Sequence, residues 1–162
     1  MTNKIEIRPV KHEDNAELAK IIRSVLTEFG ANIKGTAFYD AETDAIAEAY
    51  EAKNAKYYVA LINGKIVGGG GVSPLLKGKN DICELQKMYL LPKARGKKIG
   101  LSIFLKCLDF AKNNGFTSCY LETFPTMKGA ISFYEKLGFK RLKEQLVQSC
   151  HEACHIWMLK TL

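Results

Sequence analysis

The sequence predicts a mixed α/β fold, in which helices cover the faces of one sheet. A hairpin pattern at residues 57–72 predicts antiparallel strands. A strand–loop–helix–strand pattern over residues 83–123 predicts parallel strands joined by a right-handed crossover. Helix and strand patterns continue on both sides of these units, with no repeat or linker between them. We therefore expect a single domain over residues 1–162, with an α/β (α+β) sheet that contains both types of pairing.

The first part of the chain contains a strand pattern at residues 5–10 and then a helix. Asp14 and Glu17 form a variant capping box, which predicts where this helix begins, and Gly30 predicts where it ends. A weaker helical pattern covers residues 43–52. The apolar residues at helical spacing in the first helix are Leu18, Ile21, Ile22, Val25, Leu26 and Phe29.

The hairpin strands, 57–62 and 66–72, flank Asn63-Gly64, a pair that tolerates the positive φ angles of a type I′ turn. A third strand is expected at residues 83–90. The remaining elements are a helix from about residue 101 to 113, a strand at 116–123, a helix at 130–137 and strands at 139–148 and 153–160. The expected order is β-α-α-β-β-β-α-β-α-β-β.

Composition indicates an ordinary globular protein of the cytoplasm. No stretch approaches the ~18 uncharged apolar residues of a membrane span, and no signal-peptide pattern precedes the first strand. The five cysteines are an odd number in a chain of this size, which favours reduced thiols over a disulfide framework. We expect no membrane partner.

The formal charge of +7 favours an anionic partner, and residues 93–98 gather four of the basic side chains. No nucleic-acid partner is expected, because the sequence contains no helix-turn-helix, zinc-finger or RNP pattern. The local cluster is therefore more informative than the total charge.

The segment Arg95-Gly96-Lys97-Lys98-Ile99-Gly100 lies between a predicted strand and a predicted helix. Unpaired amides at a helix start bind anions, and glycines allow a ligand to approach the backbone closely. Walker A and dinucleotide-binding spacings are both absent. A tight turn with solvated lysines is the alternative.

This loop resembles the Gln/Arg-x-x-Gly-x-Gly/Ala signature of the GNAT superfamily of acyl-CoA N-acyltransferases. Arg95 and Gly100 match the two ends of the signature, whereas Lys98 replaces its first glycine. A second segment, Ala130-Ile131-Ser132-Phe133-Tyr134-Glu135-Lys136-Leu137-Gly138-Phe139, is similar to the late helix and strand of that superfamily. The opening Ile7-Arg8-Pro9…Asp14 is similar to its first strand and helix.

The resemblance implies a GNAT-like fold and acetyl-CoA as cosubstrate. The pantetheine arm is expected to pair with residues 88–90, and the pyrophosphate to bind the loop backbone at residues 95–101. The cofactor-binding residues it implies are Met88, Tyr89, Leu90, Arg95, Gly96, Lys97, Lys98, Ile99, Gly100, Leu101 and Tyr134.

Acetyl transfer to an amine needs a general base, and Glu84 is the first candidate. It lies in a mostly apolar strand, where burial would raise its pKa, and it resembles the carboxylate that many family members place there. It could instead pair with Lys87 or lie on a solvated face, and Glu122 is the reserve candidate. A backbone amide at residues 88–90 is expected to stabilise the oxyanion.

Tyr134 resembles the tyrosine that protonates the leaving thiolate in the family, although a packing role is the alternative. Cys150, His151, Cys154 and His155 are ligand types, but a strand would separate them onto two faces, so we expect no metal. One of these histidines is expected to line the acceptor pocket or relay a proton.

These observations together predict an N-acetyltransferase that acts by direct attack of a primary amine in a ternary complex. The acceptor would be a small-molecule amine or a peptide amino terminus, and the protein is a possible homodimer. The alternative is a non-catalytic acyl-CoA-binding or sensing module with the same fold.

Overall fold

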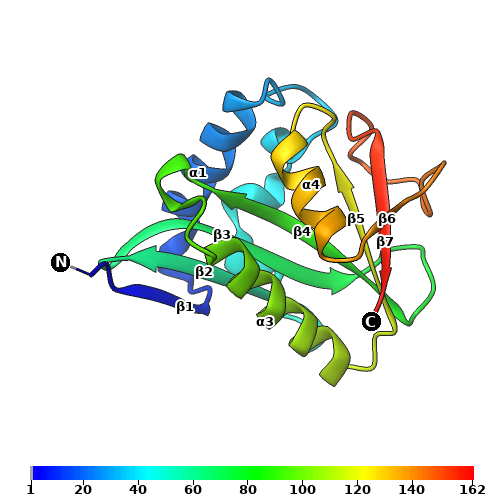
Figure 1. The fold of residues 1–162 in the computed structure, drawn as a ribbon, viewed down its shortest axis with the longest axis horizontal. Helices are drawn as coiled ribbons and strands as arrows, with labels where there is room; N and C mark the ends of the chain where they lie inside the picture. The colour runs from blue at the N-terminus through cyan, green and yellow to red at the C-terminus, as the bar shows by residue number, and fades with distance from the viewer. Residues whose placement is uncertain (1) are drawn as a thin grey trace.

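The computed structural model describes residues 2–162 and contains one seven-stranded sheet, in the order β1-β2-β3-β4-β5-β7-β6 (Figure 1). Neighbouring strands run antiparallel, except that β4 and β5 are parallel. The predicted mixed sheet is therefore confirmed. The strands are β1 (Ile5–Pro9), β2 (Lys56–Ile62), β3 (Lys65–Pro74), β4 (Ile82–Leu90), β5 (Ser118–Thr123), β6 (Lys140–Arg141) and β7 (Ile156–Thr161).

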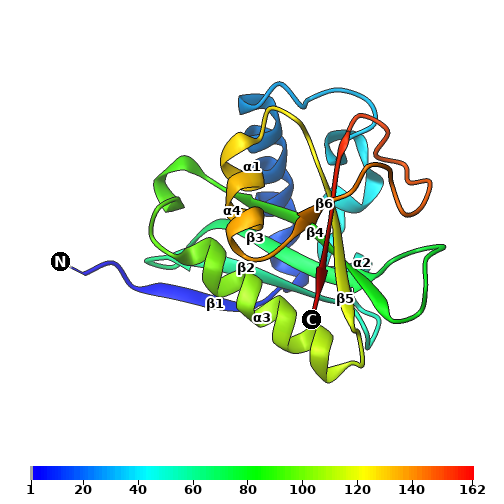
Figure 2. The same cartoon turned by 45° about the vertical axis from the view of Figure 1, so that its right-hand side comes forward.

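Helices cover both faces of the sheet (Figure 2). One apolar core lies under α3 and α4, and a second lies under α1 and α2. The helices are α1 (Asn15–Glu28), α2 (Ile46–Ala49), α3 (Ile99–Asn113) and α4 (Lys128–Lys136), with short 3-10 turns η1 (His12–Asp14), η2 (Ala37–Tyr39), η3 (Ala41–Asp44) and η4 (Pro92–Ala94). No helix in the described part of the chain is long and apolar enough to cross a membrane.

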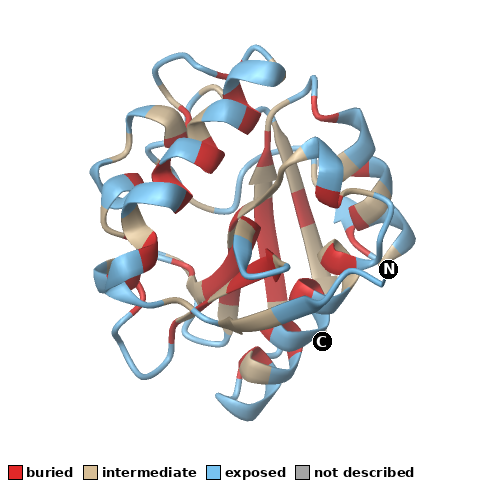
Figure 3. Cartoon of the chain, turned by 90° about the vertical axis from the view of Figure 1, so that its left-hand side faces the viewer, coloured by how far each residue is buried: buried red, intermediate tan, exposed pale blue. Residues whose placement is uncertain are grey.

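Burial follows this layered arrangement, with buried residues concentrated on the central strands and on the sheet-facing sides of the helices (Figure 3). Leu18, Ile22 and Leu26 of α1 are buried, which confirms the helical spacing that predicted this face. The β2–β3 turn is also as predicted, because Asn63 and Gly64 both have positive φ angles, 50° and 79°.

A bulge interrupts the pairing of β3 with β4. The register shifts between Gly69 and Gly71, and opposite this shift Lys87 adopts a left-handed φ of 48°. A Cβ atom on Gly69 would lie 2.5 Å from the carbonyl oxygen of Tyr58, so only glycine fits there. The hydroxyl of Tyr57 donates a hydrogen bond to the Lys87 carbonyl at 2.8 Å. The glycine run therefore serves close packing and the bulge.

The parallel pair β4–β5 separates soon after it forms. Only Ile82, Cys83 and Glu84 of β4 pair with β5, and Glu84 lies opposite Tyr120. Beyond Glu84 the two strands diverge, and this opening in the sheet leads to the N-terminal end of α3. The site described below lies at this divergence.

Three details differ from the sequence-based expectations. The expected helix at 43–52 is one turn, Ile46–Ala49, preceded by 3-10 turns. The expected strand at 139–148 is reduced to Lys140–Arg141, and the last strand begins at Ile156 rather than residue 153. The intervening residues form a loop with mostly exposed side chains, of which His151 and Cys154 line the hollow between β4 and β5.

The predicted start of the first helix is confirmed, because α1 begins directly after Asp14, but the predicted capping box is wrong. The Asp14 carboxylate accepts two hydrogen bonds from the Arg8 guanidinium, at 2.8 and 3.0 Å, and one from the Lys11 amide at 2.7 Å. It makes no side-chain cap to α1, and Glu17 is exposed. The pair between the partly exposed Arg8 and the buried Asp14 competes successfully with capping, because the fork-shaped guanidinium binds both carboxylate oxygens.

Candidate active site

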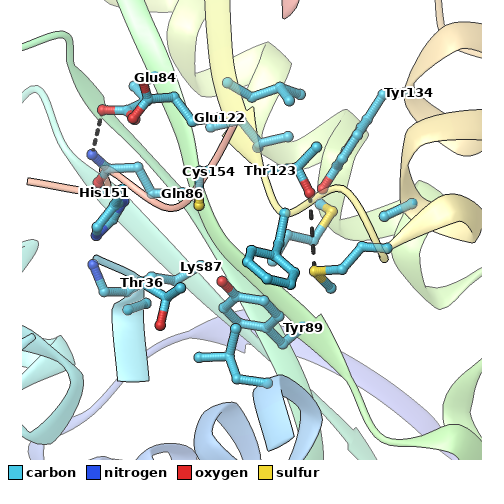
Figure 4. Close-up of a pocket in the computed structure, with 18 residues that line it drawn as sticks. Thr36, Glu84, Gln86, Lys87, Tyr89, Glu122, Thr123, Tyr134, His151 and Cys154 are labelled. Carbon is cyan, nitrogen blue, oxygen red and sulfur yellow. Dashed lines mark hydrogen bonds between the residues drawn. The ribbon is translucent and has the colours of Figure 1, made fainter. Parts of the chain in front are cut away.

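Two hollows meet at the diverging end of β4. The larger, of about 550 Å³, lies against the start of α3 and against α4. The smaller, of about 40 Å³, lies between β4, β5 and the loop before β7 (Figure 4). Met88, Tyr89 and Tyr134 line both hollows, so the two form one continuous site.

The start of α3 offers unpaired backbone amides to the larger hollow. The Ser102 amide donates to the Lys98 carbonyl at 3.0 Å and closes the first turn. The amides of Ile99, Gly100 and Leu101 precede this first intrahelical donor and therefore have no carbonyl partner within the helix. Aligned peptide dipoles give this end of the helix partial positive charge, which favours an anion.

Lys98 holds the position where the family signature has a glycine. Its φ and ψ angles are 60° and 13°, a left-handed conformation that glycine adopts without strain. Its side chain is exposed, as is that of Lys97. The departure from the signature therefore changes a side chain while keeping the backbone geometry.

The Arg95 side chain is fully engaged elsewhere. Its guanidinium donates two hydrogen bonds of 2.7 Å to Glu28 and also donates to the Leu90 carbonyl at 3.1 and 2.9 Å. It also lies over the ring of Phe29, at 5.3 Å. Arg95 thus ties the end of α1 to the end of β4, and its amide donates to Pro92. Its part in the site is to shape the loop.

Glu84 lies in the smaller hollow, and a fixed chain of hydrogen bonds orients its carboxylate. Gln86 Nε2 donates to Glu84 Oε2 at 2.8 Å (Figure 4). The Tyr50 hydroxyl donates to Gln86 Oε1 at 2.7 Å. Burial raises the pKa of Glu84 above its ordinary value; the Gln86 hydrogen bond opposes this shift, and the charge of Glu122 adds to it. Glu84 does not pair with Lys87.

Glu122 lies on β5, on the same side of the sheet as Glu84. Tyr120 is the partner of Glu84 across β4–β5, and Glu122 follows it by two residues. The hydroxyls of Tyr120 and Ser149 donate to the two Glu122 oxygens at 2.8 and 2.6 Å. Two carboxylates with different partners therefore share one small cavity.

Tyr134 projects from α4 into the junction of the two hollows (Figure 4). Its ring packs against Phe133 and Phe139, so Tyr134 has the packing contacts that the alternative role requires. Burial raises the pKa of Tyr134 well above its ordinary value, so the phenol keeps its proton. A protonated hydroxyl at this junction is suited to donate a proton.

Lys87 and His151 line the smaller hollow, and Asp40 contacts both of them. The Lys87 ammonium lies 3.5 Å from Asp40 and 3.3 Å from Glu42, with its side chain only 3% exposed. His151 Nε2 lies 2.6 Å from Asp40 Oδ2. Burial alone would lower the pKa of His151, but the hydrogen bond with Asp40 and the negative charges of Asp40 and Glu84 together outweigh burial, and the pKa is raised.

The cysteines and histidines before β7 lie in a loop, and the expected strand placement is wrong for residues 150–154. Ligand atoms of Asp40, Cys150 and His151 lie within 4.8 Å of one another, so the loop brings together groups that a strand would have separated. Cys154 lines the smaller hollow, where burial raises the pKa of its thiol to about 12.

The model of the acetyltransferase (GNAT) family matches residues 19–139. The chain belongs to this family. It is 39% identical over 157 residues to "Uncharacterized N-acetyltransferase YjgM" of Escherichia coli (strain K12), covering 96% of this chain and 94% of that protein. The family and this relative identify the protein as a transferase.

Solved GNAT structures share the fold over nearly the whole chain. A GNAT-family acetyltransferase from Staphylococcus aureus Mu50 superposes with a TM-score of 0.86 at 23% identity, covering 98% of this chain and 99% of that one. PaiA N-acetyltransferase from Thermoplasma acidophilum, solved with coenzyme A, gives a TM-score of 0.76 at 22% identity, covering 98% and 99%. The predicted GNAT-like fold is confirmed.

The structure brings together the residues that the family signature indicated. Met88, Tyr89 and Tyr134 line both hollows, and Glu84 lines the smaller one. The larger one is lined by Leu90, Arg95, Gly96 and residues 98–101, whereas Lys97 lines neither. Sequence reasoning missed Gln86, Tyr50 and Asp40. The alternation of Glu84 with Gln86 on one strand face was a usable signal for Gln86, whereas Tyr50 and Asp40 come from irregular segments that carry no periodic pattern.

Proposed function

We propose that this GNAT transferase moves an acetyl group from acetyl-CoA to a primary amine by direct attack in a ternary complex. One observation carries the proposal. Glu84, a carboxyl group with a raised pKa, and Tyr134, a phenol that keeps its proton, line one cavity that continues into the anion-binding groove of α3. A base and an acid with different proton affinities are what amine acetylation requires.

The larger hollow fits coenzyme A. The free amides of Ile99, Gly100 and Leu101 suit a pyrophosphate, and Lys97 and Lys98 add positive charge at its rim. The backbone at residues 88–90 borders the hollow where β4 leaves β5, so an extended pantetheine arm can lie along it. Coenzyme A bound to the T. acidophilum relative supports this proposal.

The proton balance assigns one role to each residue. Glu84 takes a proton from the ammonium form of the acceptor, and the neutral nitrogen attacks the thioester carbonyl carbon. The carbon–nitrogen bond forms as the carbon–sulfur bond breaks, and Tyr134 donates its proton to the leaving sulfur. The second proton of the nitrogen leaves to solvent or to Tyr134. The products are the amide, coenzyme A and one proton.

The bulge in β4 supplies the third requirement, stabilisation of the oxyanion. Lys87 is held in a left-handed conformation and its carbonyl is fixed by Tyr57, so Lys87 and Met88 leave the regular pairing with β3, which resumes at Tyr89 opposite Gly69. A backbone amide there can donate to the thioester oxygen, and it is positioned before the reaction begins.

A covalent acyl-enzyme is disfavoured by the thiols. Cys154 is the cysteine of the smaller hollow, and a pKa of about 12 leaves almost no thiolate at neutral pH. Direct transfer therefore fits the site better than a two-step exchange through sulfur.

Initial-rate kinetics with varied acetyl-CoA and varied amine test this proposal. Intersecting double-reciprocal lines are expected, because both substrates must be bound together. Parallel lines would indicate an acyl-enzyme and contradict direct attack. Tight acetyl-CoA binding without coenzyme A release for any amine would instead indicate the binding-module alternative.

A further inference from the structure

The smaller hollow contains two carboxylates, Glu84 and Glu122, that form no direct ion pair. Across residues 2–162, no lysine, arginine or histidine nitrogen forms an ion pair with Glu84 or Glu122, by a 4.0 Å limit. Gln86 contacts Glu84, and Tyr120 and Ser149 contact Glu122 through neutral groups. Buried carboxylates usually have a cationic partner.

Two cationic side chains, Lys87 and His151, line the hollow, and both are paired with carboxylates that do not line it. Lys87 lies between Asp40 and Glu42, and His151 is bonded to Asp40. An acceptor carboxylate or phosphonate would find no free cation here, and it would face Glu84 and Glu122 directly. Repulsion by the two carboxylates therefore disfavours an anionic acceptor.

We infer that the acceptor is a small linear diamine, whose first amine reacts beside Glu84 while Glu122 binds its second ammonium. This inference rests on the proposed function and adds the substrate class to it. The two hydrogen bonds on Glu122 leave lone pairs on both oxygens for a further donor. A volume of about 40 Å³ fits an unbranched chain better than a ring.

The two carboxylates therefore have different functions. Glu84, with its raised pKa, accepts the proton that makes the first amine nucleophilic. The charge of Glu122 remains available to hold an ammonium that does not react. Figure 4 shows the two side chains approaching the same end of the cavity from β4 and β5.

Three acceptors of equal length test the inference: 1,4-diaminobutane, n-butylamine and 4-aminobutanoate. The diamine has two equivalent amines, so a factor of two arises without any recognition. We expect kcat/KM for the diamine to exceed that for n-butylamine by tenfold or more, with 4-aminobutanoate the poorest. Equal values for the diamine and the monoamine after the factor of two, or a preference for 4-aminobutanoate, would overturn the inference.

The variant Glu122→Gln tests which residue holds the second cation. It keeps an acceptor for the Tyr120 hydroxyl but removes the charge, so the diamine-to-monoamine ratio of kcat/KM should fall to about two. An unchanged ratio, or an equal loss with both acceptors, would contradict the role of Glu122. The exposed Glu144→Gln is the matched control and should retain the ratio. A thermal melt of each variant shows that it is folded.

The same experiment separates the inference from the function on which it rests. Acetylation of all three acceptors without preference overturns the inference alone. Acetylation of none of them overturns the inference, and the proposed function is overturned as well only if no other amine releases coenzyme A.

Discussion

Gln86 and Glu84 point to the same face of β4, and the Gln86 amide donates a 2.8 Å hydrogen bond to the Glu84 carboxylate. Because the Tyr50 hydroxyl donates to the other end of the same amide, Gln86 can present only its nitrogen to Glu84. This bond stabilises the ionised carboxylate and limits the rise in its pKa that burial causes. Gln86 is therefore a positioning residue for the proposed base.

Replacing Gln86 with methionine should raise the pKa of Glu84 further. Since Glu84 acts only when ionised, the acidic limb of the kcat/KM profile should move to higher pH, by an amount on the order of one pH unit. The measurement is the pH dependence of kcat/KM on one confirmed acceptor. Tyr50→Phe, which leaves the Gln86 amide in place but free to rotate, should shift the limb less. A uniform loss of rate with no shift would indicate a structural role only.

Tyr134→Phe should lower turnover about tenfold or more while leaving the acetyl-CoA Kd nearly unchanged. The phenol is assigned to charge that develops as the carbon–sulfur bond breaks, so its loss affects the transition state rather than binding. The ring contacts with Phe133 and Phe139 are kept. Calorimetry gives the Kd, and turnover is measured with an acceptor for which chemistry is rate-limiting. Unchanged turnover would reduce Tyr134 to packing.

Lys98→Gly should stabilise the protein by about 1 kcal/mol, because the left-handed backbone at this residue costs an L-amino acid roughly that amount. Urea unfolding at fixed pH measures the change. Lys97→Gly is the matched control: it removes the same charge beside it, but its φ is not positive, so glycine there should be neutral or destabilising. Equal effects of the two substitutions would contradict the argument from backbone strain.

The Arg8–Asp14 pair makes stability depend on pH. Burial would raise the pKa of Asp14, but the hydrogen bonds from Arg8 and from the Lys11 amide outweigh it, and the pKa is lowered. A lowered pKa contributes stability at neutral pH that is lost as the pH falls through the folded-state value. Asp14→Asn should therefore destabilise the protein at pH 7, and the difference should shrink below about pH 4. A difference that is constant with pH would contradict this linkage.

Sequence patterns predicted the sheet, its hairpin and the Gly-containing loop before α3, because each depends on residue types that are close together in the sequence. The Asn63-Gly64 turn needs two positive φ angles, and the first face of α1 needs only helical spacing of apolar residues. Asp14 shows the limit of such reasoning. The type and position of Asp14 fit a helix cap. Its carboxylate instead binds Arg8, which lies on β1 and is not part of the helical pattern.

The acceptor side of the site could be predicted only in part. Glu84 and Glu122 were candidates because a carboxylate in an apolar strand is conspicuous. Ser149 and His151 reach the site from a loop. The path of this loop depends on its tertiary contacts, and its sequence has no periodic pattern that predicts them. The partners that orient the carboxylates therefore required the tertiary structure.

The central claim is that Glu84 removes the acceptor proton, and the pH profile of Glu84→Gln on one confirmed acceptor tests it most directly. The glutamine keeps the size of the side chain and its contact with Gln86 but cannot accept a proton. We predict that the variant folds, binds acetyl-CoA as the parent does and loses most activity near neutral pH. The loss should shrink at high pH, where more of the acceptor arrives neutral and needs no base. Parallel profiles for the two proteins, offset by a constant factor, would contradict the claim.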